Sequence, residues 1–171
     1  MHFIKSAVAS VALLSAPAAA WNGQVTFYEN AYFGGNAFTV NLSTSQRCFN
    51  LGCFNDRASS IKWSNLVTSS TWGGDYPYIA FYTDANCGGA VREWRIVENN
   101  FPQNLAFDGI NDAVTSFMIW ENTPFKYQGD YLVCPWSRRA LGEEVNEANA
   151  TESTNSTAVT ITVNEADAIK V

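Results

Sequence analysis

Histidine is almost absent from this chain, because the only one is His2. A Ser-His-Asp or Cys-His mechanism needs an imidazole to carry the proton, and many zinc sites are built from imidazole ligands. Since His2 lies in a segment with the pattern of a cleaved signal peptide, the mature chain would contain no histidine. The sequence therefore excludes most hydrolase mechanisms and an imidazole-based zinc site.

The N-terminal part also lacks an apolar run long enough to cross a bilayer, which takes about 20 residues. Residues 1–20 have the three parts of a secretory signal peptide instead. Lys5 supplies the positive charge, residues 7–14 the short apolar stretch, and residues 18–20 the small side chains before the cleavage point. We expect a secreted, extracellular protein.

Positive charge is scarce, with 10 Lys and Arg against 16 Asp and Glu and a net charge of −6. Residues 21–139 hold ten acidic and eight basic residues, whereas residues 140–171 hold six acidic residues and one Lys. The acidity therefore belongs mainly to the C-terminal segment. Nucleic-acid binding and membrane binding both favour clustered basic residues, so neither partner is predicted.

A pair of carboxylates with a catalytic signature is missing as well. The ten acidic residues of 21–139 include several in expected turns, which suits solvated surface positions better than a glycosidase pair. We therefore predict a protein that is not an enzyme, and a glycosidase remains the weakest alternative.

Helical periodicity is poor between residues 21 and 136, whereas aromatic residues and turn-forming residues are abundant. Apolar and polar residues alternate at 24–27 and 37–40, as they do in half-buried antiparallel strands. The sequence predicts an all-β sandwich with strands at residues 24–29, 37–41, 59–63, 78–82, 91–96, 115–120 and 131–134. About 116 residues suffice for one such domain.

Four cysteines in a secreted chain predict disulfides. They allow three pairings, among which the sequence does not decide. We expect Cys48 to pair with Cys53 and Cys87 to pair with Cys134.

Residues 137–171 form an acidic tail rich in Ser, Thr and Asn, which buries too little apolar surface to order itself. Within it, residues 158–163 have strand propensity, and the alternative is that they add to a sheet edge. Arg138 and Arg139 match a processing site after Arg139, or are two exposed arginines at the end of a domain. Glycosylation sequons stand at Asn41, Asn149 and Asn155.

Two segments of the sequence are repeated in the same order. The run from Tyr28 through Gly34 and Gly35 returns from Tyr82 through Gly88 and Gly89, 54 residues later. The loop 55–60, Asn-Asp-Arg-Ala-Ser-Ser, returns as Asn-Asp-Ala-Val-Thr-Ser at 111–116, 56 residues later. Such self-similarity predicts two equivalent units that bury their apolar faces against each other.

These repeats resemble the βγ-crystallins, specifically their microbial calcium-binding members. The resemblance covers residues 24–120, and both loops match the pattern N/D-N/D-x-x-S/T-S at every constrained position. It implies a βγ-crystallin-like sandwich of two Greek key motifs, about 23–66 and 77–134, within a domain of residues 21–136. It also implies two Ca²⁺ ions bound between the motifs.

By the same resemblance, each ion takes a hydroxyl and a backbone carbonyl from one loop and is completed by a turn of the other half. The groups implied for one ion are Ser59, Arg57 and Thr83. The groups implied for the other ion are Thr115, Ala113 and Glu29. Four further residues would brace the loops, the aspartates adding nearby negative charge: Asn55, Asp56, Asn111 and Asp112. Few ligands are charged, so an affinity on the order of micromolar to millimolar is expected.

The resemblance assigns structural serines to Ser60 and Ser116 and left-handed backbone to Gly35 and Gly89. One departure is that Cys87 replaces the aromatic residue that Phe33 provides in the first half. A disulfide from Cys87 would substitute for the missing ring contact.

Several alternatives stay open at this point. The loops would be metal-free relics if they had lost ligands, although neither copy has. The same scaffold occurs in secreted proteinase inhibitors and killer-type toxins, so an inhibitor or host-directed effector is the second hypothesis, with residues 44–53 as the contact loop. An extracellular protein is one candidate partner; a glycan stacked on Trp72 or Trp136 is another. We expect a monomer.

Overall fold

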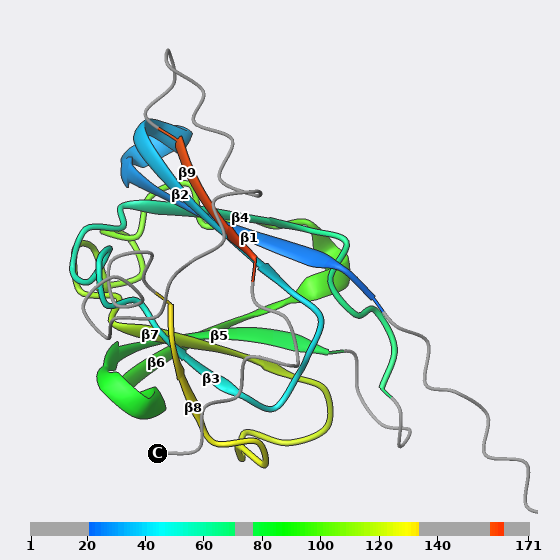
Figure 1. Ribbon diagram of the computed structural model, residues 1–171. Coiled ribbons are helices and arrows are strands. Elements are labelled where there is room, and N and C mark those ends of the chain that lie inside the picture. The colour runs from blue at the N-terminus through cyan, green and yellow to red at the C-terminus, as the bar shows by residue number, and fades with distance from the viewer. Residues whose placement is uncertain (1–20, 71–76, 134–157, 163–171) are drawn as a thin grey trace, which may run out of the picture.

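The computed structural model describes residues 21–70, 77–133 and 158–162 (Figure 1). These residues form nine strands: β1 (Gly23–Asn30), β2 (Gly34–Leu42), β3 (Cys48–Asn50), β4 (Ser60–Ser64), β5 (Tyr78–Asp84), β6 (Gly88–Arg95), β7 (Ser116–Trp120), β8 (Asp130–Leu132) and β9 (Ala158–Thr162). Three short 3₁₀ turns are η1 (Ala31–Phe33), η2 (Ala85–Cys87) and η3 (Ile96–Glu98). The seven predicted strands are all present, and the sequence missed β3, which has too few residues to show alternation.

The strands form two sheets, with the orders β4-β1-β2-β9 and β6-β5-β7-β3-β8. Figure 1 shows the two sheets as separate layers, one above the other. The first half supplies β1, β2 and β4 to one sheet, and the second half supplies β5, β6 and β7 to the other. The predicted all-β sandwich of two Greek key motifs is confirmed.

One strand of the first half lies in the sheet of the second half. β3 pairs antiparallel with β7, with Phe49 opposite Phe117. The reciprocal contact comes from the second half, where the amide of Ile61 on β4 donates to the carbonyl of Pro102 over 3.1 Å and the amide of Leu105 donates to Ser59 over 2.9 Å. The two halves are thus interlocked through exchanged segments.

Phenylalanines from both halves fill the space between the sheets. Phe27, Phe49, Phe81 and Phe117 are completely buried. The rings of Phe27 and Phe81, which occupy equivalent places in the repeat, lie 5.9 Å apart, edge to face. Burying such a ring contributes roughly 1.5–3 kcal/mol, so the shared core joins the two halves into one folding unit.

The two hairpin turns have the same backbone geometry. Gly35 and Gly89 have φ values of 75° and 74°, as expected from the sequence. In the first half the rings of Tyr28 and Phe33 pack edge to face at 5.7 Å. In the second half Cys87 takes the place of Phe33 with φ of 58° against 63°, so the turn is preserved without the ring contact.

The disulfide joins Cys48 to Cys87, with the two Cα atoms 5.8 Å apart. The predicted pairs Cys48–Cys53 and Cys87–Cys134 are therefore wrong. The reason is the strand exchange, which carries Cys48 on β3 into the second sheet and next to η2. Cys53 lies with its sulfur 3.9 Å from the carbonyl oxygen of Val133, and Cys134 is outside the described residues.

Most of the predicted tail also lies outside the described residues, together with segment 1–20, Trp72, Trp136, Arg138, Arg139, Asn149 and Asn155. Its described part is β9, so the alternative that this segment adds to a sheet edge is what the structure shows. Asn41 is half-buried on β2, opposite Gln24 of β1 and Thr162 of β9. The described residues contain no helix that is both long and apolar enough to span a membrane.

Candidate functional site

The two repeated loops meet where the halves join. The amide of Asp56 donates to the carbonyl of Val114 over 3.3 Å, and the amide of Asp112 donates to the carbonyl of Ala58 over 3.0 Å. Both aspartates have left-handed backbone conformations, with φ of 55° and 49°. Aspartate tolerates this region better than most residues, which explains why the same residue type stands at both positions.

The Thr115 hydroxyl lies within one cluster of oxygen atoms. It donates to the carbonyl of Thr83 over 2.8 Å, and its oxygen is 3.3 Å from Oδ1 of Asp56. The other carboxylate oxygen of Asp56 accepts a hydrogen bond from the side-chain amide of Asn55 over 2.8 Å. We call Thr115, Thr83 and Asp56 the threonine set.

The Ser59 hydroxyl lies within the equivalent cluster. It is 3.0 Å from Oδ1 of Asp112, whose other oxygen accepts from the side-chain amide of Asn111 over 2.7 Å. The amide of Ser59 donates to the carbonyl of Tyr28 over 2.8 Å, which places Ser59 beside Glu29 at the end of β1. We call Ser59, Asp112 and Glu29 the serine set.

Two buried serines hold the hairpin turns against the loops. The Ser60 hydroxyl donates to the carbonyl of Asn30 over 2.7 Å and accepts from the amide of Phe33 over 2.9 Å. The Ser116 hydroxyl does the same with Asp84, over 2.6 Å, and with Cys87, over 3.1 Å. Both serines are fully buried, so these bonds fix the ends of β4 and β7 from which Ser59 and Thr115 project.

The grouping of these residues differs from the expected one. The sequence resemblance placed the Thr83 turn with Ser59 and the Glu29 turn with Thr115. In the structure each turn adjoins the loop of its own half, because β5 pairs with β7 with Tyr82 opposite Ser116, and β1 pairs with β4 with Tyr28 opposite Ser60.

The contribution from the other half comes from the aspartates instead. Asp56 reaches the Thr115 hydroxyl and Asp112 reaches the Ser59 hydroxyl. The sequence resemblance assigned both aspartates a bracing role and nearby negative charge, but it did not predict this direct contact with the hydroxyl of the other half. The sequence did contain a signal for this contact, because an aspartate stands at the second position of both loops.

Arg57 and Ala113 occupy equivalent positions but have different surroundings. The Arg57 guanidinium forms an ion pair with the Glu29 carboxylate and lies over the ring of Phe54. Ala113 has no charge, and its amide donates to the carbonyl of Ile110 over 3.3 Å. The serine set therefore carries a neighbouring positive charge that its counterpart does not.

The donor atoms fit Ca²⁺. Oxygens that share a calcium ion at about 2.4 Å, and subtend about 72–90° at it, lie about 2.8–3.4 Å apart. The hydroxyl distances of 2.8, 3.0 and 3.3 Å fall in this range. Among the described residues there is no group of three or more His, Cys, Asp or Glu that could hold a metal ion, so an ion in either set would be held mainly by neutral oxygens.

Tyr82 lies beside the threonine set, since its carbonyl accepts from the amide of Thr115 over 2.9 Å. Its phenol oxygen accepts from the Trp120 indole over 3.0 Å. Burial raises the pKa of the Tyr82 phenol, and the Trp120 bond only partly offsets this effect. The side chain therefore stays neutral, and it packs with Ala80 and Met118 in a small cluster separate from the main core.

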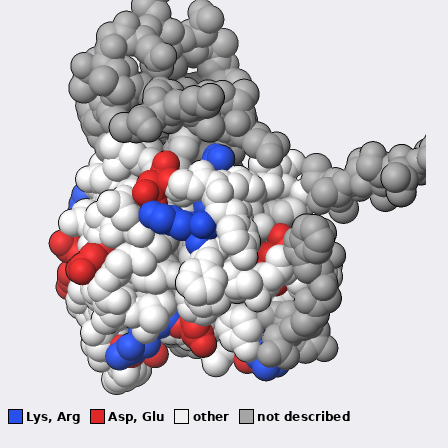
Figure 2. Space-filling model, turned by 90° about the horizontal axis from the view of Figure 1, so that it is seen from below, with Lys and Arg blue, Asp and Glu red and all other residues white. Residues whose placement is uncertain are grey.

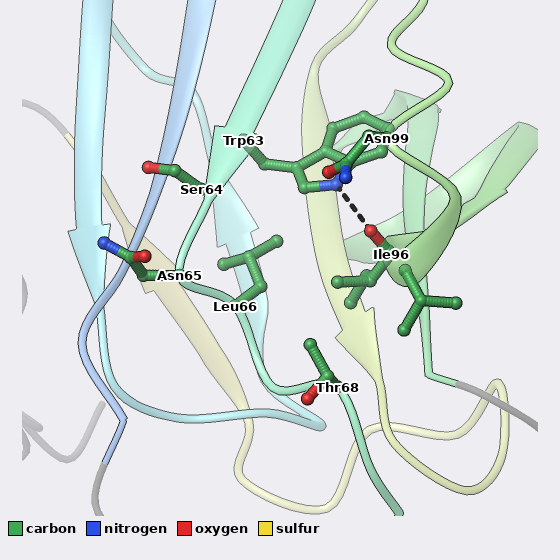
Figure 3. A pocket seen from close by; sticks show the side chains of 8 residues that line it. Trp63, Ser64, Asn65, Leu66, Thr68, Ile96 and Asn99 are labelled. Carbon is green, nitrogen blue, oxygen red and sulfur yellow. Dashed lines mark hydrogen bonds between the residues drawn. The ribbon is translucent and has the colours of Figure 1, made fainter.

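A pocket of about 390 Å³ lies elsewhere, between the end of β4 and η3 (Figure 3). Its wall includes Trp63, whose indole donates to the carbonyl of Ile96 over 3.3 Å. The lining has no charged side chain: Trp63, Ser64, Asn65, Leu66, Thr68, Ile96, Val97 and Asn99. The pocket therefore offers no carboxylate ligand for a metal ion and no ionisable side chain for proton transfer.

The chain is similar to solved structures of βγ-crystallin domains. One from an archaeon is 25% identical and covers 56% of this chain and 95% of its own, with a TM-score of 0.38. One from Clostridium beijerinckii is 24% identical, and the match covers 57% of this chain and 98% of that chain with a TM-score of 0.38. One from Ciona intestinalis is 20% identical, and the match covers 56% of this chain and 96% of that chain with a TM-score of 0.38. No protein family and no curated protein matches the sequence.

Proposed function

We propose that this chain is a secreted, non-enzymatic βγ-crystallin-type domain that binds two calcium ions, one in the threonine set and one in the serine set. The observation that carries the proposal is reciprocity: each set brings the hydroxyl of one half against an aspartate of the other. An ion in either set would connect the two halves, and so would stabilise the folded chain.

Hydrogen bonds within the chain position the ligand oxygens without a bound ion. Ser60 and Ser116 fix the ends of the strands, and Asn55 and Asn111 each hold one oxygen of the neighbouring aspartate. The second oxygen of each aspartate is thereby directed to the hydroxyl of the other half. A bound ion would add positive charge to the gathered oxygens, which in the serine set have only the Arg57 guanidinium beside Glu29.

The affinity should be modest. The threonine set has a single carboxylate, and the Glu29 carboxylate of the serine set is paired with Arg57. Sites with few charged ligands bind Ca²⁺ on the order of 10⁻⁶ to 10⁻³ M, which suits extracellular calcium concentrations. At about 100 times the dissociation constant, each occupied site adds roughly 2.7 kcal/mol to the free energy of unfolding.

The charge on the visible face of the described residues gives no support for a polyanionic ligand. On the face shown in Figure 2, positive and negative side chains lie next to one another with no continuous patch of either sign. A nucleic acid would require a basic stripe. The proposal therefore includes no nucleic-acid partner.

The contact loop of the inhibitor hypothesis does not have the expected form. Residues 44–53 are not closed by a Cys48–Cys53 bridge. Thr44, Gln46 and Arg47 are buried, and the amide of Gln46 donates to the carbonyl of Ile119 over 2.8 Å. A rigid projecting loop is thus replaced by a packed one, so no observation favours a second function.

Thermal unfolding with calcium and with a chelator tests the proposal. Calcium should raise the melting temperature of the wild type, because it binds only the folded chain. The double variant Ser59→Arg and Thr115→Arg should lose this increase. The matched control, Ser64→Arg and Thr68→Arg, adds the same charges at exposed positions outside the two sets and should keep it.

An equal melting temperature of the wild type in calcium and in chelator would refute the proposal. So would a calcium response of the Ser59→Arg and Thr115→Arg variant as large as that of the control.

A further inference from the structure

The described part of the C-terminal tail completes a sheet. β9 lies parallel to β2, with Ala158 opposite Ala37, Thr160 opposite Thr39 and Thr162 opposite Asn41. Figure 1 shows β9 along the outer side of β2, with β1 on the other side. Without β9, no other described strand would lie beside the outer amides and carbonyls of β2.

No described strand covers the equivalent strand of the second half in this way. β6 follows its hairpin turn as β2 follows the first turn, and it is the outermost strand of its sheet among the described residues. Five of its eight residues are exposed. The repeat therefore provides an internal comparison between one covered strand and one uncovered strand.

β2 and β6 differ in charge, as expected if one is covered by another strand and the other is open. β6 carries Arg92, Glu93 and Arg95, whereas β2 has no charged residue among nine. Proteins protect open sheet edges with charged side chains, since an uncharged edge recruits other strands. β2 lacks this protection, as a strand that accepts another strand must.

β2 is also held in place independently of β9. It pairs with β1 along most of its length, with Phe38 opposite Phe27 and Val40 opposite Val25. Phe38 and Val40 are buried in the shared core. The outer edge of β2 is therefore formed in advance, and an arriving strand would need only to add main-chain hydrogen bonds.

We propose that the outer edge of β2 is a strand-acceptor site, whose occupant in the structure is the tail segment 158–162 of the same chain. Main-chain bonds supply the affinity in this type of recognition. The covalent link to the domain raises the effective concentration of the segment at the site. Any other extended peptide that binds this edge must displace β9.

Proline substitution in the full chain tests the site. Val159→Pro combined with Thr160→Pro removes two adjacent amides, of which one faces β2 in an extended strand. Every second amide within 37–41 should then exchange with solvent at least about tenfold faster, because the amides of a strand point alternately to its two neighbours. The intervening amides bond to β1 and should stay protected.

Two controls separate this effect from unfolding. Amides of β5 and β7 should keep their protection in the proline variant, and its response to calcium should equal that of the wild type. Outward amides of β6 should exchange rapidly in both proteins. Unchanged exchange throughout residues 37–41 would show that β9 does not occupy the edge and would overturn the proposal.

Adding the tail segment as a separate peptide tests the acceptor directly. A synthetic peptide of residues 156–164 should restore protection of the same alternate amides in the proline variant, in a saturable manner. The same peptide with proline at positions 159 and 160 should have no effect. Failure of the unmodified peptide to restore protection at any concentration would contradict an acceptor site.

Discussion

At the scale of single residues, Asp56 and Asp112 connect the two halves of the chain, one within each oxygen set. Each has a left-handed backbone, donates its amide to the opposite loop, and directs one carboxylate oxygen to the hydroxyl of the other half. The loop pattern indicated which residue types form the sets. It did not indicate which half supplies each one, because two copies of one motif look alike.

The grouping makes a prediction for double variants. Asp56→Asn with Thr115→Ala alters only the threonine set, so one calcium ion per chain should remain bound. Asp112→Asn with Thr115→Ala alters both sets, so no ion should remain. Equilibrium dialysis with radioactive calcium counts the ions, and the opposite result for the two pairs would show that each aspartate serves its own loop.

Arg57 is the residue that makes the two sets unequal, because its guanidinium is paired with Glu29 in the serine set. Arg57→Ala keeps the backbone carbonyl and removes the positive charge. In a Thr115→Ala background, where only the serine set is intact, this change should strengthen calcium binding about threefold to tenfold. Calorimetric titration measures the change.

Arg92→Ala in the same background is the control, since it removes an equal charge from β6. Its effect on calcium affinity should stay below about twofold. Equal effects of the two substitutions would show that only net charge matters and that the Arg57–Glu29 pair has no local influence.

At the scale of elements, the feature that the sequence did not predict is the exchange of β3 into the sheet of the second half. Alternating polar and apolar residues predicted β1 and β2 within a few residues. The three residues of β3 gave no such pattern, so its transfer to the second sheet was missed. The disulfide error follows directly, since only that transfer brings Cys48 to Cys87.

The bridge should contribute strongly to stability, because it closes a sequence separation of 39 residues. The double variant Cys48→Ser and Cys87→Ser should lower the free energy of unfolding by roughly 4 kcal/mol in the chain-entropy model. Urea unfolding monitored by tryptophan fluorescence measures this loss. A loss below about 1 kcal/mol would mean that the exchanged strand holds the two halves together without the bridge.

At the scale of the whole molecule, the repeat in the sequence corresponds to two halves that share a core of phenylalanines and two reciprocal loops. The repeat therefore sufficed to predict the sandwich. It was insufficient for features that break the symmetry, namely the Arg57–Glu29 pair, the Cys48–Cys87 bridge and the pairing of β9 with β2. These depend on residues that only one half possesses.

The central claim is that the two reciprocal sets bind one calcium ion each. Isothermal titration calorimetry of the wild-type chain, after complete removal of calcium with a chelator, tests it most directly. The account predicts saturation at two ions per chain, with dissociation constants on the order of 10⁻⁶ to 10⁻³ M. Saturation at a single ion would contradict the account. So would the absence of binding heat at calcium concentrations up to about ten times the largest expected dissociation constant.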